Sequence, residues 1–254
     1  MKYSRYFKPQ QKILLKSLTD IHDPSYFEAI TVSFVRGEKD FFDLAIPYEV
    51  GSDDMAPFRP GTKFVLFSDA FGLGLQLTGQ FAGFVDRRTI RVTPHDNLEA
   101  FTRREYLRAD VTAGIHSVRG KWNLASYRQR WHGAIRAIGK DGGHAALRHL
   151  VRQQVNLSAG GIRLFLQAPV EVAELCLVVI APGDPKPPVC ALCEVAWTGA
   201  VAPTGMQPAG LRFVNILDED RLRLDRQVRA SLKQQGHDLP DSPERQDLLD
   251  RMHF

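Results

Sequence analysis

Hydrophobic and polar residues alternate with a period of two through the first part of this chain, from about residue 27. This pattern predicts strands at 27–35, 41–50, 62–67, 73–85 and 89–93. Turn-forming segments such as Arg36-Gly37 and Arg59-Pro-Gly61 separate them. Short strands at this spacing favour a small antiparallel barrel. Ahead of them, residues 9–19 start with Pro9 and carry several aliphatic side chains, which predicts a short helix.

The same alternation returns in the second half of the chain. It predicts strands at 109–116, 154–166, 173–180, 189–197 and 211–214. Asp218 is then expected to be the N-cap of a helix over 219–235, which ends at Gly236 and gathers Leu224, Val228 and Leu232 on one face. Ser242-Pro243 predicts a further short helix over 243–252.

A different pattern interrupts these strands between residues 117 and 153. Apolar side chains follow helical spacing there, at Leu124, Tyr127, Trp131, Ile135 and Ile138, with a stop expected at Gly139. Leu147, Leu150 and Val151 repeat the spacing, so we expect a helical hairpin. Its apolar stripe is predicted to pack on a barrel with its arginines in solvent. The alternative is a docking surface for an acidic partner, nucleic acid or an anionic membrane.

The length and charge of the chain limit its domain number, its location and its class of partner. A chain of 254 residues suits two domains, and no stretch has the length and apolarity of a signal peptide or membrane span, so we expect a cytoplasmic protein. The net charge is +4. Residues 117–155 hold eight basic side chains and one acidic one, a local charge of +7, so the remainder carries −3. Because the basic character comes from one segment, nucleic-acid binding over the whole surface is not indicated.

Two sequence patterns that could indicate a metal or dinucleotide site lack the residue arrangement that such a site requires. Cys190 and Cys193 form a lone CxxC within an expected strand, where residues three apart point to opposite faces and cannot chelate one metal ion. An odd count of three cysteines also argues against a disulfide framework. The glycines at 72, 74 and 79 do not complete a dinucleotide-binding loop, because position 77 is leucine and no helix pattern follows.

Chemistry is concentrated in two short segments. Arg103, Arg104 and Arg108 lie within six residues between two expected strands, and their guanidinium groups match phosphate oxygens and the O6/N7 edge of guanine. Asn156, Ser158, Gly160 and Gly161 form the second segment. Asn and Ser could cap their own backbone there, or they could bind a ligand that the two glycines allow to approach the main chain.

Taken together, these segments resemble the PilZ domain. The resemblance rests on Arg104-x-x-x-Arg108 and Asn156-x-Ser158-x-x-Gly161, followed by Val195-Ala-Trp197 and Gly210-Leu-Arg-Phe213 before a helix. With a preceding all-β domain, the whole chain is similar to the two-domain cyclic di-GMP effectors of the flagellar-brake type. The resemblance implies a mainly β protein with an N-terminal split barrel over 1–98, a six-stranded PilZ barrel over 99–236 and a tail over 237–254. The insertion at 117–153 would belong to the PilZ domain.

The resemblance also implies roles for individual residues. Arg104 and Arg108 would hold the phosphates and guanine edges of cyclic di-GMP, and Asn156 and Ser158 would hydrogen-bond the base or phosphate. Gly160 and Gly161 would leave room for the ligand. Arg103 would allow a stacked pair of ligand molecules to bind. No cofactor is expected, and the implied partners are cyclic di-GMP and a protein of the flagellar motor or the polysaccharide or pilus machinery.

Other functions remain open at this point. A PilZ scaffold can serve as a ligand-independent interaction module, and the N-terminal split barrel could hold flavin in an enzyme, although no catalytic acid and base are evident. Nucleic-acid binding through the basic insertion is a third alternative. We therefore expect a non-enzymatic cyclic di-GMP effector, recruited to the flagellar basal body or inner membrane face, and leave monomer and homodimer undecided.

Overall fold

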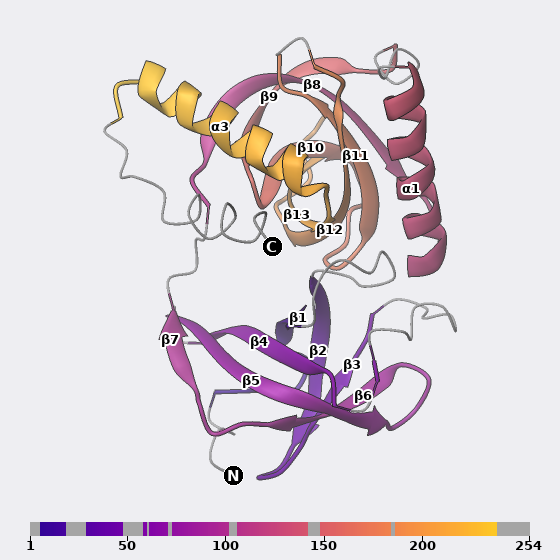
Figure 1. Ribbon diagram of the computed structural model, residues 1–254, viewed down its shortest axis with the longest axis vertical. Helices are drawn as coiled ribbons and strands as arrows, with labels where there is room; N and C mark the ends of the chain where they lie inside the picture. The colour runs from indigo at the N-terminus through magenta and orange to yellow at the C-terminus, as the bar shows by residue number, and fades with distance from the viewer. Residues whose placement is uncertain are drawn as a thin grey trace, which may run out of the picture.

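The computed structural model contains two β-barrels, one above the other in Figure 1. It describes residues 6–18, 29–47, 58–59, 61–70, 73–101, 106–141, 148–183 and 186–237. The N-terminal strands are β1 Lys12–Ser17, β2 Ala29–Gly37, β3 Phe42–Ala45, β4 Lys63–Ala70, β5 Leu73–Phe84, β6 Thr89–Pro94 and β7 Glu99–Phe101. The C-terminal elements are β8 Ala109–Arg119, α1 Leu124–Asp141, β9 Val151–Ser158, β10 Gly161–Gln167, β11 Leu175–Ala181, β12 Val189–Thr198, β13 Met206–Asn215 and α3 Asp218–Gln234.

The N-terminal barrel is a ring of six antiparallel strands. Its order is β4-β1-β2-β3-β6-β5, and β5 closes the ring by pairing with β4. The short strand β7 adds to one end of β5. Alternate side chains such as Ile13, Leu15 and Leu66 are fully buried inside, so the period of two in the sequence marks the inner face.

The C-terminal barrel is also closed and antiparallel, with the order β10-β13-β12-β11-β8-β9. Its interior is filled by alternate residues of all six strands, among them Leu157, Ile162, Cys193 and Leu211. The resemblance predicts a mainly β protein with two barrels, the C-terminal one six-stranded, and this is confirmed.

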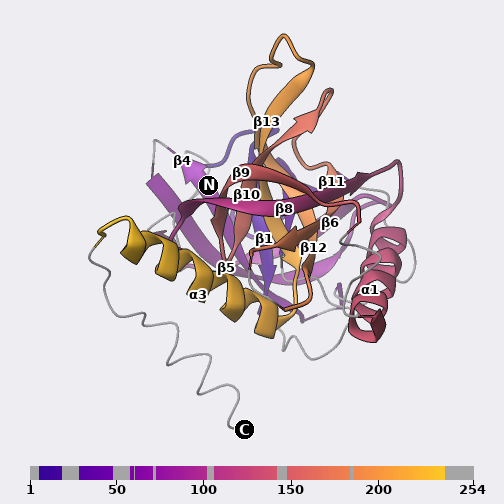
Figure 2. The ribbon, with the colours of Figure 1, turned by 90° about the horizontal axis from the view of Figure 1, so that it is seen from above.

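The two helices pack on different sides of the C-terminal barrel (Figure 2). The α3 face formed by Leu224, Val228 and Leu232 is buried against the barrel core, as the spacing predicts. On the other side, α1 contacts β11 and β12. Its residues Tyr127 and Trp131 are buried there, which confirms the predicted packing of the apolar stripe on a barrel. The prediction that the arginines lie in solvent is wrong for Arg128, which is 6 % exposed because it lies next to Tyr127 on the packed side of the helix.

Trp131 offers a direct measure of how much this helix contributes to stability. Its indole is 7 % exposed and its Nε1 donates a hydrogen bond of 3.0 Å to the Cys190 carbonyl. Trp131→Ala is expected to lower the free energy of unfolding by about 3–5 kcal/mol, because it leaves a large cavity and an unpaired carbonyl. Urea unfolding measures this loss. Gln129→Ala, on the exposed side of α1, serves as the control, and equal stability of the two variants would contradict the packing role.

The cysteines of the CxxC pair lie on opposite faces of β12, as predicted. Cys193 packs inside the barrel, whereas Cys190 packs on the outside under α1. Both are free thiols, and burial raises the pKa of Cys190 to about 12 and raises that of Cys193 well above its usual range. These thiols are held in the protonated form and act as small core residues.

The helix predicted at 9–19 is wrong, because β1 occupies most of this segment. β1 pairs with β2 on one side and β4 on the other, and Ile13, Leu15 and Ser17 point inward. Four aliphatic residues within six positions fit either a helix or a strand. Two neighbouring strands that satisfy its backbone groups decide in favour of the strand.

Two further predictions need correction. The single strand expected at 154–166 is two strands, β9 and β10, joined by a turn at Ala159-Gly160. The helical hairpin is wrong in the described residues: α1 runs through Gly139, Leu150 lies in a turn segment and Val151 begins β9. Leu147 lies outside the described residues. Leu147, Leu150 and Val151 are at helical spacing in the sequence, but Val151 belongs to a strand, in which it pairs with Ile115 of β8.

The boundaries of α3 and of the first barrel also differ from expectation. The N-cap of α3 is Leu217, which makes no side-chain cap hydrogen bond, and Asp218 is the first helical residue. The acidic Asp218, Glu219 and Asp220 are instead favourably placed in the first turn, near the positive end of the helix dipole. The strand β7 was not predicted. The helix expected over 243–252 lies outside the described residues.

Among the described residues, none of the helices has the length and hydropathy required to cross a lipid bilayer.

Candidate functional site

The strand register of the C-terminal barrel gathers the sequence motifs on the outward-facing side of its strands, where Arg108 is exposed but Ser158 is only 2 % exposed. Ser158 of β9 lies opposite Gly161 of β10, Gly161 lies opposite Arg212 of β13, and Arg212 lies opposite Glu194 of β12. Ala109 pairs with Leu157, so the next position along the register sets Arg108 beside Ser158. Directly opposite residues share one face of a sheet. We call this set, Arg108, Ser158, Gly161, Arg212 and Glu194, the Ser158 row.

The turn between β9 and β10 is held tightly by the neighbouring strand. The Ser158 hydroxyl donates a hydrogen bond of 3.0 Å to the Gly161 carbonyl, and the Phe213 N–H donates one of 3.0 Å to the Gly160 carbonyl. A Cβ at Gly161 would lie 2.2 Å from the carbonyl oxygen of Leu211. Glycine is therefore needed at 161 because the backbone of β13 passes too close for a side chain.

Tyr106, between the two motif arginines in sequence, packs against this turn. A Cβ at Gly160 would lie 2.6 Å from the Tyr106 ring. The buried guanidinium of Arg221, from the first turn of α3, lies 5.8 Å from the centroid of the same ring and donates to the Ala159 carbonyl at 3.1 Å. Tyr106 and α3 thus fix the turn from outside the barrel. The space expected for a ligand at Gly160 is occupied in this structure by the ring of Tyr106.

A second outward row runs beside the first and contains Asn156. It consists of Asp110, Asn156, Arg163, Gly210 and Trp197, each opposite the next on neighbouring strands. We call it the Asn156 row. Its polar groups contact one another: Asn156 Nδ2 donates to Asp110 Oδ1 at 2.9 Å, and Arg163 Nη2 lies 3.5 Å from the same oxygen.

Trp197 ends the Asn156 row with an aromatic surface. Its indole Nε1 would lie 1.9 Å from a Cβ at Gly210, so the ring covers the place where a side chain of residue 210 would stand. The rest of the ring faces solvent, so that Trp197 is 41 % exposed. An exposed indole beside Arg163 provides a surface on which a planar base can stack.

The structure brings together the predicted site residues that it describes. Arg108, Asn156, Ser158, Gly160 and Gly161 lie on two adjacent outward rows and the turn that joins them. Arg103 and Arg104 lie outside the described residues. Arg163, Arg212 and Asp110 were not predicted, because only the register of the barrel places them beside the motifs. Alternation within the strands would have marked them as outward, without showing which outward residues are neighbours.

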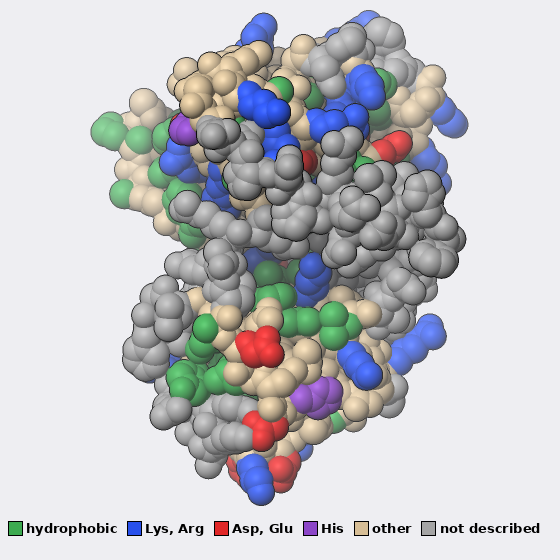
Figure 3. Space-filling model, turned by 60° about the vertical axis from the view of Figure 1, so that its left-hand side comes forward, with side chains coloured by type: hydrophobic (Ala, Val, Ile, Leu, Met, Phe, Trp, Pro, Cys, Tyr) green, Lys and Arg blue, Asp and Glu red, His purple; other side chains and the backbone are tan. Residues whose placement is uncertain are grey.

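Basic side chains are concentrated on the C-terminal barrel in the view of Figure 3, where the upper part of the molecule shows most of the lysine and arginine. The lower part of the molecule shows fewer Lys and Arg side chains on this face, mixed with Asp, Glu and His. The outward arginines of the two rows belong to the more basic barrel, which suits an anionic ligand.

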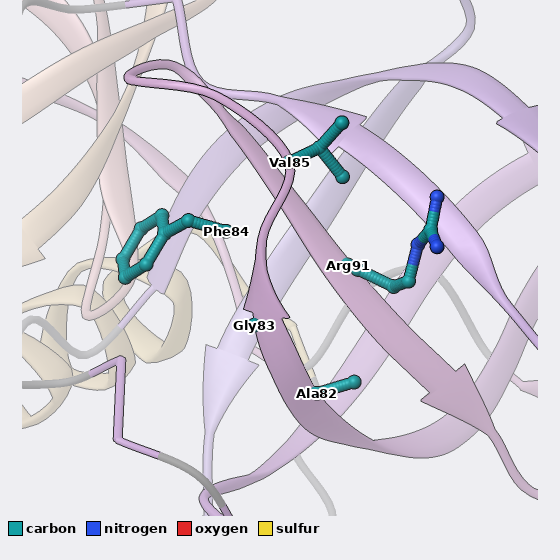
Figure 4. Close-up of a pocket in the computed structure, with 5 residues that line it drawn as sticks. All are labelled: Ala82, Gly83, Phe84, Val85 and Arg91. Atoms are coloured by element: carbon teal, nitrogen blue, oxygen red, sulfur yellow. The ribbon is translucent and has the colours of Figure 1, made fainter.

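The N-terminal barrel has a small hollow, the place where a cofactor of this barrel would be expected. It lies at a bulge of β5 and is lined by Ala82, Gly83, Phe84, Val85 and Arg91 (Figure 4). Its volume is about 220 Å³, which is below the 300–1,000 Å³ typical of ligand pockets. Arg91 donates to Asp43 on the neighbouring strand, and that hydrogen bond lowers the pKa of the Asp43 carboxyl. This cation is thus part of the barrel's own ion pairing.

Comparison with known families agrees with this geometry. The sequence profile of the PilZ domain matches residues 103–230, a span that contains both motif segments and both outward rows. The chain belongs to the PilZ domain family. The matched span contains β8 to β13 and most of α3, and α1 lies between β8 and β9 within it. No curated protein matches the chain significantly in sequence.

Solved structures that align with the chain include three proteins of low identity. The inhibitor of motility MotI/DgrA from Bacillus subtilis is 13% identical, with 90% of this chain and 97% of that chain covered and a TM-score of 0.34. YcgR from Escherichia coli, solved with c-di-GMP, is 13% identical over 89% and 85% of the two chains, with a TM-score of 0.34. MrkH from K. pneumonia, also with c-di-GMP, is 11% identical over 85% and 84%, with a TM-score of 0.29.

Proposed function

We propose that this PilZ protein is a non-enzymatic receptor for cyclic di-GMP that binds the nucleotide on the outer face of its C-terminal barrel. The observation that carries the proposal is the Ser158 row, in which Arg108 from the arginine segment lies beside Ser158 and Gly161 from the second segment. Two segments that are about 50 residues apart in sequence thus form one surface. A ligand that spans both segments would contact the arginine side chains of one segment and the small polar groups of the other.

The chemistry of this surface suits a cyclic dinucleotide of guanine. Arg108, with Arg104 upstream of it, supplies guanidinium groups for the phosphates and for the O6/N7 edge of guanine. Ser158 and Asn156 supply a hydroxyl and an amide for further hydrogen bonds. Arg163 and Trp197 extend the surface with another cation and an exposed indole for stacking.

Binding is proposed to alter the arrangement of the two barrels and so to change the surface offered to a protein partner. The arginine segment joins the barrels, and a ligand that neutralises it lowers the repulsion among its three guanidinium groups. The ligand can shift the arrangement only by binding one form more tightly than the other. The partner class that fits is a component of the flagellar motor or of polysaccharide or pilus machinery.

A calorimetric titration at modest salt tests ligand identity. Cyclic di-GMP is expected to bind, whereas cyclic di-AMP, with the same ring and charge, is expected to bind at least about a hundredfold more weakly, since adenine lacks the O6 acceptor. Equal affinities would mean that only charge is recognised. No heat with either nucleotide, confirmed by a second binding method, would contradict the proposed function.

The number of bound nucleotides tests the role of Arg103. If Arg103 supports a stacked pair of ligand molecules, the titration saturates at two nucleotides per protomer, and Arg103→Ala lowers this to one. The physical reason is that a further cation offsets the doubled phosphate charge and stacks on guanine. Saturation of the wild-type protein at one nucleotide would remove this role for Arg103.

A ligand-independent interaction module is the second candidate, and one observation favours it. The Ser158 hydroxyl and the Asn156 amide already bond to Gly161 and Asp110 within the protein. In that case both motif residues stabilise the barrel surface. A negative titration together with unchanged partner capture in the presence and absence of cyclic di-GMP would favour this alternative.

A further inference from the structure

The contact between the two barrels contains a buried carboxylate. Glu194 of β12 is 0 % exposed, and its carboxylate accepts a hydrogen bond of 2.9 Å from the N–H of Thr31, which belongs to β2 of the other barrel. The Thr31 hydroxyl also donates to Glu194. Arg212 Nη2 completes the group by contacting Glu194 Oε1 and by donating to Thr31 Oγ1 at 2.6 Å. A single cluster of three side chains therefore joins the barrels.

Glu194 is buried at a place where the N-terminal barrel contacts the outward side of β12. Its neighbours Cys193 and Val195 point into the C-terminal barrel, so Glu194 points outward. β2 and β12 pack against each other at this place, where the barrels meet (Figure 1). If the barrels moved apart, water would reach both Glu194 and Arg212. Burial of the Glu194 carboxylate carries a desolvation cost that its contacts with Arg212 and Thr31 offset, and hydration after separation of the barrels would remove that cost.

Thr31 is free to make this contact because of the local strand pairing. On one side, residues 29–33 of β2 pair with β1. On the other side, the pairing with β3 begins only at Ser33. Among the described residues, the Thr31 amide thus has no strand partner on this side of β2, and the Glu194 carboxylate accepts its hydrogen bond instead.

The same cluster is continuous with the candidate ligand site. Arg212 and Glu194 are the last two members of the Ser158 row, and Arg212 lies directly opposite Gly161. Neighbouring strands are about 4.8 Å apart, so a phosphate held at Ser158 and Gly161 would lie within reach of the Arg212 guanidinium. Within the described residues, the buried Nε of Arg212 has no hydrogen-bond acceptor. Arg212 retains a donor that an anion could use.

We propose that Thr31, Glu194 and Arg212 form a latch that holds the two barrels together in the nucleotide-free protein and that opens when an anionic ligand recruits Arg212. This inference rests on the proposed binding of cyclic di-GMP for its trigger, although the latch itself does not. A phosphate at Gly161 competes with Glu194 for the guanidinium. Glu194 would then be buried without its cation, which is costly, and separation of the barrels relieves that cost by admitting water.

The latch can be tested without nucleotide by measuring the distance between the barrels. Spin labels at Lys39→Cys and Gln129→Cys lie on exposed residues of the two barrels, and the three native cysteines are buried and protected from labelling. Pulsed electron resonance of the labelled protein is expected to give one narrow distance distribution. Thr31→Val, which removes the hydroxyl at similar volume, is expected to add a second, longer-distance population, whereas Thr31→Ser is expected to restore the narrow one.

Matched controls separate the latch from general effects of the substitutions. Thr112→Val makes the same change at an exposed strand position of the C-terminal barrel. Glu194→Gln removes the charge at the centre of the latch and is expected to lengthen the distance between the spin labels. Glu171→Gln removes one exposed charge and is expected to leave that distance unchanged. Unchanged distances in both Thr31→Val and Glu194→Gln, with native circular dichroism, would overturn the latch.

Nucleotide binding by the same variants tests the coupling. If the latch must open before the nucleotide binds, the free energy of opening weakens the apparent affinity of the wild-type protein. Thr31→Val removes this free-energy cost and is expected to tighten the apparent affinity for cyclic di-GMP by about tenfold. Thr112→Val is expected to leave the affinity unchanged. Weaker binding by Thr31→Val would overturn the direction of the coupling. If the wild-type protein binds no cyclic di-GMP, the proposed function fails, and the nucleotide-free distances still decide whether the latch exists.

Discussion

Arg108→Ala is expected to weaken the binding of cyclic di-GMP by at least about a hundredfold, because it removes two or more charge-assisted hydrogen bonds from one ligand. Arg108 is exposed at the start of β8 and lies at the register position beside Ser158. Its loss removes a cation from the binding surface, and the barrel core remains intact because the side chain is outside it. Arg104→Ala, four residues upstream, is expected to have the same effect.

Calorimetry of these variants needs a control for overall charge. Arg226→Ala removes one positive charge from the exposed side of α3, where the guanidinium contacts only its own helix at the Leu222 carbonyl among the described residues. This variant is expected to bind the nucleotide with wild-type affinity. Thermal unfolding should show all three variants folded. Wild-type affinity in both Arg104→Ala and Arg108→Ala would refute the proposed site.

Gly161→Ala is expected to destabilise the PilZ barrel, lowering the free energy of unfolding by about 1–3 kcal/mol. The added methyl group would meet the Leu211 carbonyl oxygen at 2.2 Å, and backbone in the middle of a paired strand cannot move away without breaking its hydrogen bonds. Ligand affinity should fall as well, since the strain lies between Ser158 and Arg212 in the Ser158 row.

Gly160→Ala provides the matched comparison for this prediction. Its methyl group would meet the ring of Tyr106 at 2.6 Å. A side chain that packs on the surface can rotate away, so the loss in unfolding free energy is expected to be smaller than for Gly161→Ala. Chemical denaturation of both variants gives the two values. A Gly161→Ala protein as stable as the wild type would show that the approach of β13 to this turn is not a tight constraint.

The binding surface depends on information of two kinds. The residue types could be predicted from sequence, because three arginines in six residues and Asn-x-Ser-x-x-Gly are local patterns with a direct chemical meaning. Their arrangement could not, because the neighbours of Ser158 across the barrel depend on strand order and register. Arg163 and Arg212 illustrate this: Arg163 stands in no recognised motif, Arg212 stands in Gly210-Leu-Arg-Phe213, and only the strand register shows that both lie beside the Asn-x-Ser-x-x-Gly segment.

The inter-barrel cluster shows the same limit more strongly. In sequence, Glu194 is a single acidic residue in an apolar strand, and Thr31 is a polar residue in another. Thr31 and Glu194 are 163 residues apart, and their contact arises only when two separately formed barrels meet. Local patterns carry no signal for such a pairing.

The sequence by itself determined the strand faces, the α3 stripe, the opposite orientation of Cys190 and Cys193 and the two motif segments, because each depends on the period of two or 3.6 within a few residues. The tertiary structure decided that residues 12–17 form a strand, that β9 and β10 are separate, and that Arg108, Ser158, Gly161, Arg212 and Glu194 form one row. These outcomes depend on which distant strand satisfies each backbone N–H and carbonyl group, and that choice is made when the barrels close.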